Sequence, residues 1–387
     1  MQIVIHTPYI QELNNRCRLC ADIEWDGHTH QLWYETEKKY GSYFVTDLSD
    51  SFVVALLLFA MEKGADLLVE GGMSERLHVQ LTNNLIPVIA KNISQYSYIP
   101  TIFAKKKNIA YSSHAVGTGF SCGVDSFYTI YKGLEHSSDS PMRLTHLCFF
   151  NAGNNGGNGG KTARKVFNIR REKFQQVASE IGLEFLSVDC NINEFLHQLH
   201  VSTHTFRTLS IPLALQKLFK LYYFSSGFPA NDFRFDYYDA GTYDIFSIPN
   251  LCTQNTQFML VGSETTRIGK VNYISNYSIV QQHLHVCLDN KNVKVVKNCC
   301  KCKKCKRTML ELYLCGKIEN FYDSFDVDYF YSHLDSIIRW ALRTGSGKKA
   351  EPDMPEIIKL LDQKQLISKQ NYLIYYLSKP YYWWKRN

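Results

Sequence analysis

The sequence predicts an α/β protein with a doubly wound parallel sheet, a metal-binding loop, an N-terminal α+β domain and a C-terminal helical segment. Two observations carry this prediction. From about residue 113 onward, strand patterns alternate with helix patterns at the spacing of βαβ units. Further on, Cys287 is followed by Cys299, Cys302 and Cys305 at a spacing typical of a metal site. With 387 residues, of which 45% are hydrophobic, the chain is long enough for two or three domains with cores of their own.

Residues 1–112 are expected to form the N-terminal α+β domain. Strand patterns alternate with turns at the start, and the apolar run after Asp50 and Ser51 is typical of a buried helix. The expected elements are strands at 3–5, 16–25 and 31–35, a helix at 52–63, a strand at 66–70 and a helix capped by Ser74. Nothing in this region indicates catalysis.

Residues 113–310 are expected to form the doubly wound domain. The predicted strands are 116–120, 143–150, 183–188, 221–225 and 258–262, with helices beginning near Val124 and spanning 164–181 and 206–220. Such sheets bind ligands beyond the carboxyl ends of their strands, where both Ser121 and Asn151 fall. The glycine-rich segment 151–160 could close over a ligand or be a passive connection.

Residues 311–387 are expected to be mostly helical, because apolar positions at 310–314, 329–342 and 357–366 recur at helical spacing. The aromatic and basic end, 381–386, suits packing against the domain better than contact with a membrane or nucleic acid.

The cysteine-rich loop at 287–307 predicts one tetrahedral Zn²⁺ site. Three thiols on tight turns and a fourth upstream can converge on one ion, and four thiolates leave no open coordination position. The site formed by Cys287, Cys299, Cys302 and Cys305 is therefore expected to be structural, with Cys300 and Cys315 free.

A second motif, Ser121-Cys122-Gly123-Val124-Asp125-Ser126, joins a predicted strand to a predicted helix. A glycine-containing turn in that position directs backbone N–H groups toward an anion at the helix N-terminus. The serine hydroxyls can donate to phosphate, and Asp125 suits a bound Mg²⁺. The G-K-[ST] ending of a Walker loop is absent.

This loop resembles the SGGxDS motif of the PP-loop ATP pyrophosphatases, with Cys122 in place of the first glycine. With the Cys-x11-Cys-x2-Cys-x2-Cys-x-Arg pattern that ends at Arg307, the chain resembles an enlarged member of the 7-cyano-7-deazaguanine synthase (QueC-like) family over residues 115–310. In the same comparison Cys300 occupies a glycine position. Phe150 and Asn151 end the second strand, and Arg207 and Arg267 fall where the family has basic residues opening helices. Both arginines are expected to line the pocket, from opposite sides of the carboxyl edge of the sheet.

The resemblance implies binding of ATP, Mg²⁺ and Zn²⁺ and adenylation of a carboxylate with release of pyrophosphate. The acceptor would be a 7-deazaguanine-type molecule or, by analogy with enlarged relatives in antiviral defence clusters, a protein. Two alternatives stay open. One is a PP-loop RNA-modifying enzyme (a tRNA thiolase or amidine-forming ligase) with Cys122 or Cys190 as catalytic cysteine, and the other is a non-catalytic, zinc-stapled interaction module.

The charge and the apolar content of the sequence indicate which cellular compartment and which kinds of partner to expect. The net charge of +7 is mild, but residues 291–307 contain eight basic side chains and no acidic one, which suits an anion or a solvated surface equally. No leader precedes the first strand, and the apolar run at 52–61 is too short to span a membrane. A cytoplasmic protein without membrane contact is expected. Nucleic-acid binding is not favoured, and a homodimer remains open.

Overall fold

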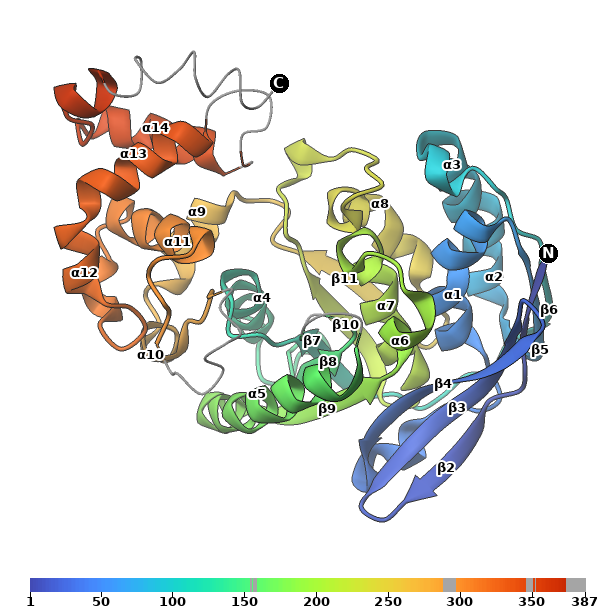
Figure 1. Cartoon of the computed structure of the whole chain (residues 1–387). Helices are drawn as coiled ribbons and strands as arrows, with labels where there is room; N and C mark the ends of the chain where they lie inside the picture. The colour runs from blue at the N-terminus through green and yellow to red at the C-terminus, as the bar shows by residue number, and fades with distance from the viewer. Residues whose placement is uncertain (154, 156–158, 288–296, 346–350, 352, 374–387) are drawn as a thin grey trace. The chain divides into compact units, whose positions relative to one another are not determined.

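The structure is a computed structural model that describes residues 1–153, 155, 159–287, 297–345, 351 and 353–373 (Figure 1). Residues 291–296 of the basic stretch, parts of the segments 151–160 and 345–355, and the aromatic end at 381–386 therefore lie outside the described residues. The chain divides into two compact units. Unit 1 comprises Met1–Ser121 and Thr129–Glu264, and unit 2 comprises Cys122–Tyr128 and Thr265–Asn387.

Unit 1 contains a mixed, mostly parallel sheet in the order β11-β10-β7-β8-β9-β4-β3-β1-β5-β6, with β2 paired to β3. Its strands are β1 (Gln2–Ile5), β2 (Tyr9–Leu13), β3 (Arg16–Trp25), β4 (His28–Glu37), β5 (Asp66–Ser74), β6 (Ile102–Lys107), β7 (Ala115–Gly119), β8 (His146–Asn151), β9 (Glu184–Cys190), β10 (Phe219–Ser225) and β11 (Gln257–Val261). The predicted α/β class with a large parallel sheet is confirmed.

The five strands β7 to β11 are all parallel to their neighbours. From β7 the chain proceeds to β8 and β9 on one side and then crosses to β10 and β11 on the other. This reversal makes the boundary between β7 and β10 a topological switch point, the usual ligand position in open α/β sheets. The loop that begins at Ser121 leaves β7 at this boundary.

Helices cover both faces of the parallel part of the sheet. Phe149 and Phe150 are consecutive in β8, so their side chains point to opposite faces. Phe149 stacks on Phe167 of α5, whereas Phe150 stacks on Tyr222 within the core that α1 and α7 complete. The helices of unit 1 are α1 (Asp50–Lys63), α2 (Glu75–Gln80), α3 (Ile86–Asn92), most of α4 (Val124–Leu134), α5 (Gly160–Ile181), α6 (Ile192–Leu196), α7 (His200–Ala214) and α8 (Asp244–Ser247).

The N-terminal strands do not form the separate domain that the sequence predicted. Strand β4 pairs antiparallel with β9, with Tyr34 opposite Cys190 and Glu35 opposite Asp189. This pairing makes one continuous sheet, and one hydrophobic core runs through both parts. The predicted boundary at residue 112 therefore falls inside unit 1, because strand pairing between distant segments is not encoded in local patterns.

Unit 2 is helical where it is described. Its helices are α9 (Arg267–Ile274), α10 (Ser278–His283), α11 (Lys303–Leu314), α12 (Val327–Ser332), α13 (Leu334–Thr344) and α14 (Met354–Gln363), and it also includes the first turn of α4. The cysteine-rich loop belongs to this unit rather than to the sheet domain, which corrects the predicted division at residue 310. In the described part of the chain, no helix is long and apolar enough to cross a membrane.

Candidate functional site

The four predicted metal ligands lie together in unit 2. The Sγ atoms of Cys287, Cys299, Cys302 and Cys305 all lie within 4.8 Å of one another. Two of the distances are 3.9 Å (Cys299 to Cys305) and 3.3 Å (Cys302 to Cys305). Tetrahedral Zn–S bonds of about 2.3 Å place sulfur atoms roughly 3.8 Å apart. The cluster is therefore positioned to bind one metal ion and has dimensions compatible with Zn²⁺.

Asn298 links the segment that contains Cys287 to the segment that contains the other three cysteines. Its Oδ1 accepts hydrogen bonds from the backbone N–H groups of Val286 (2.8 Å) and Cys287 (3.1 Å), and its Nδ2 donates to the carbonyl of Leu284 (2.8 Å). The side chain is buried, so these bonds are shielded from water. The upstream ligand is thus fixed beside the other three by a residue that the sequence motif did not single out.

Helix α11 begins inside the cluster. Cys302 is its N-cap, and the backbone N–H of Cys302 donates to Cys299 Sγ at 3.3 Å. Cys305 lies in the first turn and is buried. A thiolate at this end of a helix is favoured by the helix dipole. The expected exclusion of Cys300 and Cys315 from the cluster agrees with its four members.

The predicted phosphate loop directly precedes α4. Val124 is the first residue of the helix, and the Ser126 hydroxyl accepts from the backbone N–H of Gly123 (3.1 Å) and donates to its carbonyl (3.0 Å). Ser121 is exposed and belongs to unit 1, whereas Cys122 to Ser126 belong to unit 2. Cys122 has φ = 55° and is completely buried. The cysteine therefore adopts the left-handed conformation that glycine adopts most easily.

Asp125, in the first turn of α4, lies between two cations from α9. Its carboxylate accepts a hydrogen bond from Lys270 Nζ at 2.9 Å and lies 3.6 Å from Arg267 Nη1. Burial raises the pKa of Asp125, but the charges of Lys270 and Arg267 outweigh burial, so the pKa lies below its ordinary value. The carboxylate is ionised at neutral pH, as a ligand for Mg²⁺ must be.

Arg267 is held from its other side by α11. Its Nε lies 3.2 Å from Glu311 Oε1, and its Nη2 donates to Thr308 Oγ1 at 3.1 Å. Glu311 is completely buried, and burial raises its pKa to about 7. Only 12% of the Arg267 side chain is exposed. Its guanidinium therefore has a fixed position, set by α11 on one side and by Asp125 on the other.

Two connections join the cysteine cluster to the loop. The helix that carries Cys302 and Cys305 also carries Thr308 and Glu311, which hold Arg267 against Asp125. In the segment just before Cys287, the backbone N–H of His285 donates to the carbonyl of Cys122 at 2.8 Å. The metal-binding cluster and the predicted phosphate loop therefore form one hydrogen-bonded assembly within unit 2.

Lys270 is the residue of this assembly that sequence reasoning missed. Only 2% of its side chain is exposed, and it lies one turn after Arg267 on α9. The available signal was a second cation three residues after Arg267, which places both on one face of a helix.

Three other predicted site residues lie in unit 1. Asn151 and Phe150 end β8, as predicted, and both are buried. Asn151 Nδ2 donates to Asp189 Oδ1 at 2.7 Å. Arg207 lies in the middle of α7 rather than at a helix start, and it is almost completely buried. It donates to Asn193 Oδ1 and to the carbonyl of Gln198 (3.1 Å).

Arg207 belongs to unit 1 and Arg267 to unit 2, so their placement on opposite sides of one pocket stays a prediction. Burial lowers the pKa of Arg207 to about 10. The helix was predicted to begin at Phe206, but α7 begins at His200, and this shift of six residues moves Arg207 from the helix start into the core.

The assembly in unit 2 therefore combines a four-cysteine cluster with an aspartate held between two cations at the start of a helix. Comparisons of this chain with protein-family models, with curated proteins and with solved structures find no match, so what this assembly does must be argued from its own chemistry.

Proposed function

We propose that this protein is an ATP pyrophosphatase of the PP-loop type that adenylates a carboxylate and releases pyrophosphate, with one structural Zn²⁺ bound by its four-cysteine cluster. The observation that carries the proposal is the position of Asp125 between Lys270 and Arg267, directly after the Cys122–Gly123 turn. An acidic residue surrounded by cations at a helix N-terminus suits a Mg²⁺–polyphosphate group, in which both signs of charge must be matched.

The fold supports this proposal independently. The parallel strands have the order β9-β8-β7-β10-β11, and the loop follows β7, the strand at the switch point. Nucleotides bind at this position in doubly wound sheets.

Each residue has a role in the proposed reaction. The backbone N–H groups of the loop and the side chains of Lys270 and Arg267 would bind the phosphates of ATP and stabilise the negative charge that develops on the leaving pyrophosphate. Asp125 would hold Mg²⁺, which supplies further neutralisation of that charge. An oxygen of the acceptor carboxylate attacks the α-phosphorus, the bond from the α-phosphorus to the α,β-bridging oxygen breaks, and AMP remains on the carboxylate as an acyl adenylate.

The acceptor follows from the family resemblance. A 7-carboxy-7-deazaguanine-type acid or a protein carboxylate would be activated in this way, and ammonia or another amine would then displace AMP. The four thiolates fill a tetrahedral coordination sphere, so Zn²⁺ would support the fold and would not activate water.

The test is the identity of the products. With ATP, Mg²⁺ and candidate acceptors, the protein should form AMP and pyrophosphate, and Asp125→Ala and Lys270→Ala should each reduce the rate at least about a hundredfold, because each removes charge complementarity at the phosphates. Asp328→Ala, an exposed site in α12, is the matched control. Formation of ADP and phosphate would refute the proposal.

The RNA-modifying alternative is less well supported. A thiolase needs an accessible thiolate, but Cys122 and Cys190 are both buried, and burial raises the pKa of Cys190 to about 12. A non-catalytic interaction module would consume no ATP with any acceptor, and the product assay distinguishes this outcome as well.

A further inference from the structure

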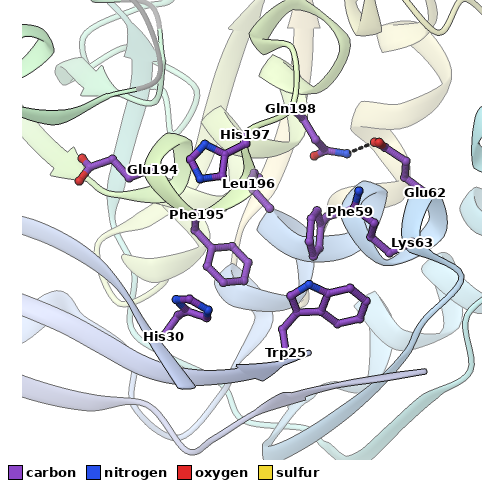
Figure 2. A pocket seen from close by; sticks show the side chains of 10 residues that line it. All are labelled: Trp25, His30, Phe59, Glu62, Lys63, Glu194, Phe195, Leu196, His197 and Gln198. Carbon is purple, nitrogen blue, oxygen red and sulfur yellow. Dashed lines mark hydrogen bonds between the residues drawn. The ribbon is translucent and has the colours of Figure 1, made fainter. Parts of the chain in front are cut away.

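A cavity of about 390 Å³ lies in unit 1, and none of its lining residues belongs to the proposed ATP site (Figure 2). Its walls come from the end of β3 and the start of β4, from the C-terminal turn of α1 and from the α6 segment. The volume is at the lower end of the range for small-molecule sites. The cavity is therefore large enough for a small ligand or for one side chain of a partner.

One wall of the cavity is a continuous aromatic surface. The ring of Trp25 contacts that of Phe59 (centroids 5.5 Å apart), and Phe59 contacts Phe195 (5.7 Å). His30 extends the surface through Phe195 (5.4 Å). Figure 2 shows these four side chains grouped on one side of the site. Aromatic faces attract planar groups and cations.

The cavity lining also contains a hydrogen-bond acceptor, the carboxylate of Glu62. Gln198 Nε2 donates to Glu62 Oε2, as the dashed line in Figure 2 shows. This bond fixes the orientation of the Glu62 carboxylate. Glu62, oriented by this bond, therefore presents a carboxylate to a ligand that carries N–H groups.

Elsewhere in unit 1, a tryptophan ring with carboxylates close by is occupied by arginine side chains. Two guanidinium groups lie over the indole ring of Trp33, with Arg18 Cζ at 4.1 Å and Arg164 Cζ at 5.1 Å from the ring centroid. Each guanidinium also donates to a carboxylate: Arg18 to Glu35 (2.7 Å) and Arg164 to Asp189 (3.0 Å). The cavity repeats this combination of indole and carboxylate, but no arginine is among the residues that line it.

We propose that the cavity at Trp25, Phe59 and Glu62 binds a guanidinium group supplied from outside the described chain. The flat cation would lie on the aromatic wall, and its N–H groups would donate to the Glu62 carboxylate. Lys63, at the same cavity, has its Nζ 5.7 Å from the Phe59 ring, which shows that this ring face already accommodates a cation. Since Lys63 is exposed, its ammonium can remain in solvent while the guanidinium occupies the wall.

Calorimetric titration of the full-length protein tests this site. L-Argininamide should bind with 1:1 stoichiometry, and L-lysinamide, which has the same charge but no planar fork, should bind at least about tenfold more weakly. Glu62→Gln should weaken argininamide binding about tenfold, because one charge-assisted pair is lost. Gln198→Leu should also weaken it, because this variant loses the hydrogen bond that orients the Glu62 carboxylate. Glu12→Gln, an exposed carboxylate on β2, is the matched control and should bind like the wild type.

Two further probes identify the source of the guanidinium. Equal affinity for N-methylguanidine and for the tripeptide Gly-Arg-Gly would indicate a small guanidinium compound, whereas at least about tenfold tighter binding of the tripeptide would indicate an arginine of a polypeptide. Equal binding of lysinamide and argininamide would overturn the proposal. Absence of guanidinium binding by the folded protein, or wild-type affinity in a folded Glu62→Gln variant, would overturn it as well. The result is independent of ATP turnover, so neither proposal stands or falls with the other.

Discussion

Two cysteines occupy backbone conformations that glycine adopts more easily. Cys122 in the loop before α4 has φ = 55°, and Cys300 in the metal-binding segment has φ = 57°. Both stand where the resembling families have glycine. At each position the cysteine forms a left-handed turn that glycine would form without the steric cost of a Cβ atom. Cys300 also has a separate use, because its Sγ accepts a hydrogen bond from the backbone N–H of Asp326 at 3.3 Å.

The backbone cost at Cys122 can be measured with two substitutions. Cys122→Ala and Cys122→Gly both remove the buried thiol, but only glycine relieves the left-handed strain. We expect the glycine variant to be more stable than the alanine variant by about 1 kcal/mol, since relief of strain outweighs the extra flexibility that glycine gives the unfolded chain. Urea unfolding of the two variants measures the difference, and an alanine variant as stable as the glycine variant would show that the turn can relax.

Glu311 predicts a pH dependence of stability. Burial raises the pKa of Glu311 to about 7, against 4.5 ordinarily, so between these pH values the folded chain binds more protons than the unfolded chain. The free energy of unfolding should therefore fall as pH rises from about 4.5 to about 7, by on the order of 3 kcal/mol from this group. Glu311→Gln keeps the shape and an acceptor for Arg267 but does not titrate. Urea midpoints at pH 5 and pH 7.5 should differ less in this variant than in the wild type. Equal changes in the two proteins would show that Glu311 is ionised throughout.

At the scale of elements, α11 provides one of the two connections between the cysteine cluster and the loop. Its first turn contains Cys305, and its later turns contain Thr308 and Glu311, which position Arg267 at the start of α9. Each of these contacts depends on where the helix begins. The ligands at Cys302 and Cys305 fix that start.

Removal of the metal should therefore loosen residues beyond the cluster. A structural thiolate site contributes about 10–16 kcal/mol of apparent binding free energy, so chelation or Cys302→Ser should increase amide hydrogen exchange along α11 and in the first turn of α9. Elemental analysis should give one zinc ion per chain in the wild type and less in the variant. Cys315→Ser, at the far end of α11, should retain the metal. Unchanged exchange in α9 after zinc loss would show that Arg267 is held without the cluster.

At the scale of the molecule, the N-terminal strands complete the sheet that contains the parallel strands. Besides the ladder between β4 and β9, Thr36 Oγ1 donates to the Ser187 carbonyl (2.9 Å), and Tyr40 OH donates to the Phe185 carbonyl (3.3 Å). Helix α1, also from the N-terminal part, packs against α7 in the shared core. The first 112 residues therefore stabilise the strands that follow them.

A chain that begins at residue 113 should not fold stably. Removal of β4 exposes the edge of β9, and removal of α1 exposes the apolar face of α7, so the fragment should aggregate or remain unfolded. Soluble yield and a cooperative thermal transition by circular dichroism measure this. A monomeric fragment with a sharp transition would restore the predicted domain boundary at residue 112.

Many of the strands and helices, and the cysteine cluster, could be predicted from the sequence. The alternation of strands and helices after residue 113 is confirmed, as is the start of α4 at Val124, because hydrophobic periods are local. The helix start at Arg267, expected from the family resemblance, is also observed. The cysteine spacing likewise predicted which four thiols converge, since loops of two residues permit few arrangements. Strands β2 and β6 were missed: β2 is largely exposed and β6 is rich in lysine, so neither shows a buried period.

The tertiary structure alone decided which distant residues meet. The sequence by itself determined the α/β class, the cysteine cluster and the loop before α4, each from residues close together in the chain. It did not place Lys270 against Asp125, 145 residues away, or Glu311 behind Arg267. Nor did it show that β4 would pair with β9 and merge two predicted domains into one sheet. Such contacts depend on how the elements pack and not on local periodicity, and for that reason they could be read only from the folded chain.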